Sequence, residues 1–355
     1  MVPYIIAITL IEASRIFRAD SKRKRFAVSL FCAIIFILLL GMRHPSMGQD
    51  LLYMSKYGYL GGFQNIAKAS WEIEVYQNYE WGYIIFNKLI SVFTTDTQVF
   101  LAVCAACSIL PFAYVIYKYS DDIQTSYIVF WGNPIFTMLF SGLRQGLAIG
   151  ILFLTIGLIK NRKFIRFFLT VCIAAQIHSS AYVFLLAYPI YHIGLLNQTV
   201  KTVLVAAIPV AVVLRRILFT IFTSLISSKK VVDDNGAINL FLLSFFFLLF
   251  IFYKVKTENK ELNGFIKIYY FACLTLVFTS VNAIALRVTF YFIDILILLV
   301  PMLYMRDIQS ADAEIQSHSK GVLIAFVNLL FIVLGLFFII TTSWAKAYPY
   351  YFFWE

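Results

Sequence analysis

Hydrophobic residues occur along this chain in long blocks separated by short polar segments. A helix that crosses a membrane needs about 20 mostly apolar residues, and about 17 are still sufficient. The blocks predict eleven crossings and a twelfth near the C-terminus, at residues 2–17, 26–42, 97–117, 123–140, 142–160, 164–178, 180–195, 199–214, 237–253, 264–283, 286–305 and 321–342. We therefore expect an all-α polytopic membrane protein with about 11–12 transmembrane helices, folded as a single membrane-embedded domain over residues 1–355.

Composition supports this class and argues against nucleic acid as a partner. Hydrophobic residues make up 61% of the chain and charged residues 13%, about half the charged share of soluble domains. The net charge of +11 would suit nucleic-acid binding, but the basic residues cluster in short segments between apolar blocks. Such clusters are typical of cytoplasmic loops, so the lipid bilayer is the expected partner.

The basic clusters also predict the orientation. Segments 15–25, 160–166 and 254–260 are rich in Lys and Arg, which places them on the cytoplasmic side and the N-terminus outside. An odd number of crossings must then separate residue 80 from Lys160. The apolar run 81–93, which is short and contains polar residues, is therefore expected to be a re-entrant or interfacial helix. It belongs to the principal periplasmic loop, residues 43–96.

Ionisable residues gather at the outer ends of the expected crossings. A charge at membrane depth is costly, so each is a functional candidate; they are Arg43, Asp50, Glu80, Arg144, His178, Arg215, Arg216 and Arg287. Plainer explanations stand beside this one. Arg43 can snorkel to lipid headgroups, Arg215 and Arg216 can be interfacial charges, and Asp50 and Glu80 can be ion-pair partners of Arg43 or Arg144.

Arg144 and Arg287 carry the strongest chemical signal, because each lies between apolar stretches with few acidic neighbours. The planar guanidinium suits an anionic partner such as a phosphate. His178 is expected at the same depth as Arg144, where it could accept a proton from a hydroxyl. Together these residues suit a lipid-linked diphosphate. Four histidines and no clustered ligands argue against a metal, and we expect no cofactor.

The same residues lie in short motifs that resemble one family. The motifs are Arg43 with Gly48-Gln-Asp50 and Tyr53, Glu80-Trp-Gly82, Leu143-Arg-Gln-Gly-Leu-Ala148, Ile173-Ala-Ala-Gln-Ile-His-Ser-Ser180 and Leu286-Arg-Val-Thr-Phe-Tyr291. Their order and spacing are similar to those of the EpsG-type branch of the Wzy-like O-antigen and exopolysaccharide polymerases. One departure is Gln49, where a small hydroxyl residue would be expected before Asp50.

The resemblance implies a GT-C-like glycosyltransferase of the bacterial inner membrane that needs no metal and acts at the periplasmic face. It would transfer a growing glycan from undecaprenyl diphosphate to the non-reducing end of a lipid-linked repeat unit. Arg144, Gln145 and Arg287 would bind the diphosphate, with Arg43, Arg215 and Arg216 as secondary candidates. His178 would be the catalytic base or would orient the acceptor, and Asp50 and Glu80 are alternative bases. A chain-length regulator and a flippase are candidate partners.

Two alternatives share this substrate class. An O-antigen ligase uses the same donor, but ligases usually carry a large periplasmic loop late in the chain, and here residues 224–239 are a short loop. A lipid-linked oligosaccharide flippase is a transporter, and it should carry charge through the full membrane depth. In this sequence the charge concentrates at one face, which favours a polymerase.

Overall fold

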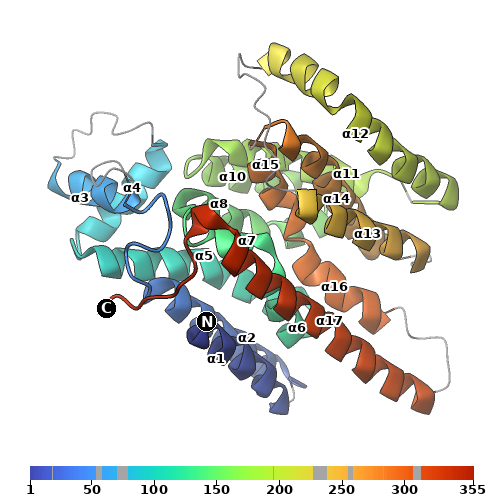
Figure 1. Ribbon diagram of the computed structural model, residues 1–355, viewed down its shortest axis with the longest axis horizontal. Coiled ribbons are helices and arrows are strands. Elements are labelled where there is room, and N and C mark those ends of the chain that lie inside the picture. The colour runs from blue at the N-terminus through green and yellow to red at the C-terminus, as the bar shows by residue number, and fades with distance from the viewer. Residues whose placement is uncertain are drawn as a thin grey trace. The chain divides into compact units, whose positions relative to one another are not determined.

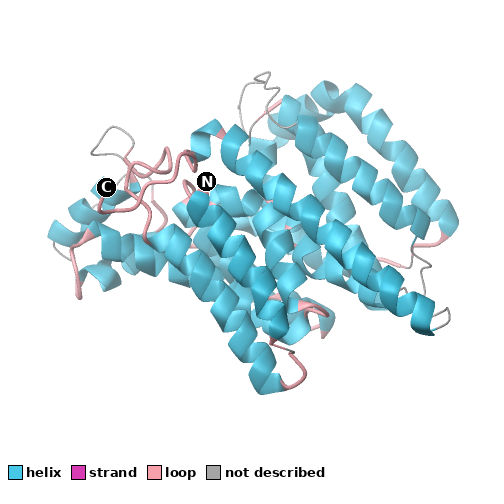
Figure 2. Cartoon of the chain, turned by 60° about the horizontal axis from the view of Figure 1, so that its bottom comes forward, coloured by secondary structure: helices cyan, strands magenta, loops and turns pink. Residues whose placement is uncertain are grey.

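The computed structural model describes residues 1–17, 19–52, 58–69, 79–194, 196–226, 238–254, 259–282, 284–306 and 313–355. These residues form helices joined by loops (Figure 2). The one β-type pairing among them is an isolated bridge between Arg43 and Phe352. The predicted all-α polytopic class is confirmed.

Contacts group the chain into two compact units. The first unit comprises Met1–Tyr182 and Val300–Glu355. Its helices, most of them labelled in Figure 1, are α1 (Val2–Ala13), α2 (Lys22–Gly41), α3 (Tyr59–Lys68), α4 (Trp81–Ser91), α5 (Thr97–Tyr119), α6 (Ile123–Gly132), α7 (Pro134–Met138), α8 (Leu143–Phe153), α9 (Ile156–Lys160), α10 (Phe164–Ala175) and α17 (Ala313–Thr341), with the short 3₁₀ turns η1 (Ser14–Ile16) and η4 (Ser343–Ala345).

The second unit comprises Val183–Leu299. It contains α11 (Ala187–His192), α12 (Gln198–Ile226), α13 (Ile238–Lys254), α14 (Lys260–Leu276), η3 (Val277–Ser280) and α15 (Ile284–Ile293). Two elements continue across the limits of the units, η2 (Ser179–Leu186) and α16 (Leu296–Arg306). The expected late loop 224–239 lies mostly outside the described residues.

Six helical stretches of the described chain are long and apolar enough to cross a membrane. They are Lys22–Gly41, Thr97–Tyr119, Leu143–Lys160, Thr199–Ile221, Lys260–Ser280 and Gly321–Thr341. A seventh is the pair Ile284–Ile293 and Leu296–Met305, which is bent by 41°. The chain is thus a multi-pass membrane protein.

The other expected crossings are shorter or broken helices. Residues 123–140 form α6 and α7, because Asn133 leaves the helical conformation and caps the next helix ahead of Pro134. Proline at the first position of a helix starts it and cannot continue the preceding one. Residues 180–195 likewise form a 3₁₀ stretch followed by the short helix α11.

The run 81–93 forms the 11-residue helix α4, which packs beside α3 (Figure 1). One of the polar residues that argued against a crossing, Lys88, contributes to this packing. The Lys88 ammonium donates to the carbonyl oxygens of Ile66 and Ala69 at 3.1 and 2.5 Å, and so caps the end of α3. The short helix is observed, whereas its re-entrant or interfacial position stays a prediction.

Small residues bring α8 close to α5. Gly146 and Gly150 are four residues apart and therefore share one face of α8. A Cβ atom on Gly150 would lie 2.8 Å from the carbonyl oxygen of Ser108, in α5. Such pairs of small residues let helix backbones approach closely in membranes. This contact fixes the start of α8, where Arg144 lies.

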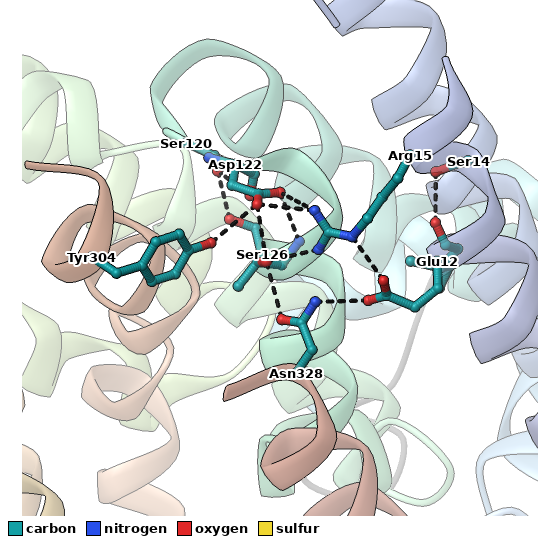
Figure 3. Close-up of polar contacts among 10 residues, drawn as sticks. Glu12, Ser14, Arg15, Ser120, Asp122, Ser126, Tyr304 and Asn328 are labelled. Carbon is teal, nitrogen blue, oxygen red and sulfur yellow. Dashed lines mark hydrogen bonds and ion pairs between the residues drawn. The ribbon is translucent and has the colours of Figure 1, made fainter. Parts of the chain in front are cut away.

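A polar network joins the chain's first helix to three later ones (Figure 3). The Arg15 guanidinium donates to Glu12 at 2.7 Å and to Asp122 at 3.0 Å. Tyr304 of α16 also donates to Asp122, and Asn328 of α17 donates to Glu12 at 2.8 Å. Arg15 belongs to a basic cluster in the sequence, and in the structure it also links Glu12 to Asp122.

Candidate functional site

Arg144 lies in the first turn of α8 and forms an ion pair with Glu80. Its Nη1 donates to Glu80 Oε2 at 2.6 Å, and both side chains keep just under a fifth of their surface exposed. Arg144 has no acidic residue near it in the sequence, and its carboxylate partner comes from 64 residues earlier in the chain. The alternative, that Glu80 is its ion-pair partner, is confirmed.

Three tyrosine rings surround the Arg144 guanidinium. The distances from Cζ to the ring centroids are 4.7 Å for Tyr79, 5.8 Å for Tyr59 and 5.9 Å for Tyr83. Aromatic rings within about 6 Å attract a cation electrostatically. Arg144 is thus oriented by one carboxylate and by a cage of aromatic faces from the segment that contains α3 and α4.

The second oxygen of Glu80 faces His178. Oε1 accepts the backbone N–H of Ser179 at 2.8 Å and lies 3.7 Å from His178 Nδ1. The histidine lies just after α10, and its side chain is 16% exposed. Glu80 therefore connects Arg144, in α8, with His178, in the turn after α10. We call Glu80, Arg144 and His178 the carboxylate-centred cluster.

A glycine makes the approach of these segments possible. Gly82 lies in the first turn of α4, against Gln176 at the end of α10. A Cβ atom at Gly82 would lie 2.7 Å from both Cβ and the carbonyl oxygen of Gln176. The Tyr83 N–H donates to that same carbonyl at 3.1 Å. The close contact places the carboxylate of Glu80 at the turn that carries His178.

The cluster keeps Glu80 ionised. Burial by itself would raise the pKa of the Glu80 carboxyl, because it disfavours the charged form. Hydrogen bonds from backbone N–H groups, foremost that of Ser179, and the charge of Arg144 outweigh burial and leave this pKa below its usual range. At neutral pH the carboxylate is therefore charged where it contacts Arg144 and faces the His178 ring.

Asp50 lies near the same end of α8. Its carboxylate accepts the hydroxyl of Ser141 at 2.9 Å, and its backbone N–H donates to that hydroxyl at 3.1 Å. Gly48 shapes the loop before it, with φ +106, and a side chain there would collide with the carbonyl of Phe140. Asp50 thus contacts Ser141, which lies three residues before Arg144 in the chain. The Asp50 side chain remains exposed.

Arg43 is held by backbone groups. Its side chain is among the largest fully buried ones, at 1% exposure. The guanidinium donates to the carbonyl oxygens of Leu40 and Phe140 and lies 5.3 Å from the Phe140 ring centroid. Burial does not fit a side chain that snorkels to headgroups. Arg43 joins the end of α2 to the segment before α8. This buried contact supports the start of α8, where Arg144 of the carboxylate-centred cluster lies.

The sequence profile of the EpsG family matches residues 26–352, a stretch that contains every residue of the cluster. This chain belongs to the EpsG family. No curated protein and no solved structure matches it. Membership supports a role of the polysaccharide-polymerase type in a membrane.

The remaining candidate arginines of this EpsG-family chain all lie in the second unit. Arg215 and Arg216 lie within α12, which continues to Ile226 instead of ending near 214 as expected. Arg215 donates to the carbonyl of Val212 at 2.6 Å. Arg287 lies in the first turn of α15 and is exposed. Gln145, next to Arg144 in α8, is buried.

Sequence reasoning missed Tyr59 and Asp294. Tyr59 belongs to the cage around Arg144, and no periodic pattern in the sequence indicated this contact. Asp294 lies at the break between α15 and α16, and its side chain is 3% exposed with Oδ1 lacking a hydrogen-bond partner in the described structure. A single aspartate inside the apolar run 286–305 was the signal that could have found it.

Two further expectations concern metal binding and the motif residue Tyr53. No group of three or more His, Cys, Asp or Glu side chains within the described ranges is placed to hold a metal ion. Tyr53, which belongs to the first family-like motif, lies outside the described residues. Within the described residues the candidate chemistry is therefore that of the carboxylate-centred cluster and Asp50.

Proposed function

We propose that this protein is a metal-independent polymerase of surface polysaccharide, which transfers a growing glycan from undecaprenyl diphosphate to the non-reducing end of a lipid-linked repeat unit at the periplasmic face. The carboxylate-centred cluster is its reaction site. One observation carries the proposal: Glu80 binds Arg144 through one oxygen and faces His178 through the other. A cation and a proton acceptor are thereby held a few ångströms apart at a partly exposed position.

Arg144 is the residue for the donor diphosphate. A guanidinium has five N–H donors, and Glu80 engages Nη1. Nε is buried, and the Nη donors that Glu80 does not engage suit phosphate oxygens. As the bond between the sugar's anomeric carbon and the diphosphate oxygen breaks, negative charge grows on the leaving group, and a preoriented cation stabilises it. The tyrosine cage keeps the guanidinium in place when the diphosphate competes with Glu80 for it.

His178 takes the proton of the acceptor. The acceptor hydroxyl attacks the anomeric carbon, its oxygen forms the new glycosidic bond, and its proton passes to the imidazole. Undecaprenyl diphosphate leaves with the electron pair of the broken bond. Glu80 faces Nδ1, so it orients the ring and stabilises the imidazolium, as a carboxylate does beside a catalytic histidine. Asp50 lies close enough in the fold to bind acceptor hydroxyl groups.

The test uses purified protein in liposomes with a synthetic lipid-linked repeat unit. The wild-type chain should extend the repeat, and the new polymer should remain attached to the lipid diphosphate. Arg144→Ala should lower the rate by about 100-fold or more, the scale seen when one group that stabilises developing charge is removed. Arg144→Lys should restore only part of it, because an ammonium lacks the planar fork.

The alternatives give different results in the same assay. A ligase would leave the repeat unextended and would transfer it when lipid A core is supplied. A flippase would move the labelled repeat across the liposome membrane without changing its length. Either result would contradict the polymerase proposal, and full extension by a correctly inserted Arg144→Ala variant would contradict the role assigned to Arg144 in it.

A further inference from the structure

The segment that follows α17 lies across the loop that follows α2 (Figure 1). We call residues 342–353 the C-terminal segment and residues 42–50 the Asp50 loop. Three backbone hydrogen bonds join them, from the N–H groups of His44, Gln49 and Phe353 to the carbonyl oxygens of Tyr351, Trp344 and Met42 at 2.9, 3.2 and 2.9 Å. The bridge between Arg43 and Phe352 belongs to the same contact. Two segments far apart in the sequence thus pair through their backbones.

The Asp50 loop depends on these external contacts for its conformation. Inside it, a backbone hydrogen bond joins Met47 to His44 at 3.0 Å, and the His44 ring contacts the Ser46 hydroxyl at 2.8 Å. Neither contact reaches Asp50. Backbone groups outside helices and sheets need partners elsewhere. The C-terminal segment supplies them on one side, and Ser141 binds Asp50 on the other.

Two buried tyrosine hydroxyls fasten the C-terminal segment to the first unit. Tyr350 donates to the carbonyl oxygen of Leu39, in α2, at 2.9 Å, and Tyr4 of α1 donates to that of Ala347. Tyr4 and Ala347 are fully buried, and Tyr350 is 9% exposed. The two tyrosine rings also contact each other edge to face, with centroids 5.4 Å apart. Aromatic residues of a membrane interface keep their polar groups at the headgroups, whereas these hydroxyls bind backbone inside the protein.

The end of the Asp50 loop reaches the cage around Arg144. The Tyr59 N–H donates to the backbone carbonyl of Asp50 at 2.9 Å, and the Tyr59 ring centroid lies 5.8 Å from Cζ of Arg144. The loop therefore determines the place of one exposed carboxylate and of one ring of the cage. A displacement of the loop would move both groups relative to Arg144.

We propose that the C-terminal segment is a positioning element of the reaction site, and that Tyr4 and Tyr350 are the positioning residues that fasten it. The segment holds the Asp50 loop so that Asp50 stays on Ser141 and Tyr59 stays beside Arg144. The inference rests on the proposed function, because that function assigns acceptor hydroxyl groups to Asp50. Looser fastening should weaken substrate binding, since the binding groups would be misplaced in part of the molecules.

The test uses the full-length variant Tyr4→Phe/Tyr350→Phe, which loses both hydroxyls and keeps both rings. Hydrogen exchange at the His44 and Gln49 amides should become up to about 30-fold faster, because each lost hydrogen bond is worth about a fivefold factor in local opening. In liposomes, the concentration of lipid-linked repeat that gives half-maximal extension should rise by about tenfold, the scale of one hydrogen bond to a charged group. The maximal rate should stay near that of the wild type, whereas a general loss of folded protein would lower it.

Tyr127→Phe/Tyr269→Phe is the matched control. These buried hydroxyls also donate to backbone carbonyls, those of Ser29 and Ser244 at 2.6 and 3.0 Å, and they do not bond to the C-terminal segment or the Asp50 loop. The control should lose stability similarly and keep wild-type exchange at His44 and Gln49 and a wild-type half-maximal concentration.

Wild-type exchange in Tyr4→Phe/Tyr350→Phe would overturn the proposal. So would an unchanged half-maximal concentration despite faster exchange, and so would equal effects in the control. A wild-type protein that does not extend the repeat would refute the proposed function itself. The exchange comparison needs no substrate, so it would still decide whether the C-terminal segment holds the Asp50 loop.

Discussion

Glu80 and Arg144 are 64 residues apart in the sequence and lie 2.6 Å apart in the structure. Their ion pair connects the N-terminus of α4 to the first turn of α8. Because the second oxygen of Glu80 faces His178 at 3.7 Å, this one carboxylate organises both charged partners of the proposed site. Removing it should therefore affect stability and reaction together, and the two effects can be separated by pH.

Glu80→Gln should lower the free energy of unfolding by about 1–3 kcal/mol at pH 7, because Arg144 then loses its carboxylate. The lowered pKa of Glu80 means that the ionised form stabilises the fold. This contribution is complete above the unfolded pKa of about 4.3 and is lost as the pH falls through the lower folded value. Thermal unfolding between pH 7 and pH 3 should show a constant difference from the wild type down to about pH 5. A difference that already vanishes at pH 6 would contradict this account.

His178→Ala should reduce extension of the lipid-linked repeat far more than it reduces binding of the donor. General-base catalysis typically contributes about 100- to 10,000-fold to a rate, whereas the diphosphate is assigned to Arg144. Steady-state rates and donor affinity, measured separately on the same preparation, check this. His178→Gln, which keeps a polar group of similar length, serves as the control for packing. Equal losses of rate and of affinity would indicate that His178 binds the donor instead.

Arg43→Met should destabilise the protein by about 1–3 kcal/mol, although Met fills a similar volume. The reason is that the carbonyl oxygens of Leu40 and Phe140 would lose their buried donor. The measurement is the melting temperature in detergent, with exposed Arg162→Met as the control that should change little. If Arg43→Met melts like the wild type and loses only donor binding, then Arg43 belongs to the diphosphate site.

Asp294→Asn should leave the melting temperature unchanged or raise it. A buried carboxyl oxygen without a partner costs free energy, and asparagine has nearly the same shape without a charge. The cost to be relieved is about 1–3 kcal/mol. A loss of stability on this scale would show that the carboxylate has a partner. Loss of repeat extension with unchanged stability would instead identify Asp294 as functional.

The orientation can be checked with two engineered cysteines at exposed positions, Thr95→Cys and Asn161→Cys. Thr95 lies before α5, on the predicted periplasmic side, and Asn161 lies after α9, on the predicted cytoplasmic side. A membrane-impermeant maleimide should label the first in intact spheroplasts and the second only after lysis. The background comes from native Cys107, which is exposed, so Cys107→Ser is the parent variant. Reversed labelling would move the proposed site to the cytoplasm.

The sequence by itself determined the class of this protein and most of the residues of interest. Long apolar blocks leave no soluble alternative, because each crossing must satisfy its backbone hydrogen bonds within a helix. The motifs around Glu80, Arg144 and His178 indicated the EpsG family, which the match over residues 26–352 confirmed. The sequence also predicted a short helix at 81–93, and α4 is that helix.

Only the tertiary structure decided which charges meet. Arg43 was a candidate for an exposed site, whereas the structure buries it against backbone carbonyl oxygens. The close packing at Gly82 places Glu80 between His178 and Arg144. Hydropathy reports how apolar a segment is and carries no information on the partner of a polar side chain. Ion pairs and aromatic cages depend on contacts between residues far apart in the chain, such as Tyr59 and Arg144. Those contacts exist only after the helices have packed.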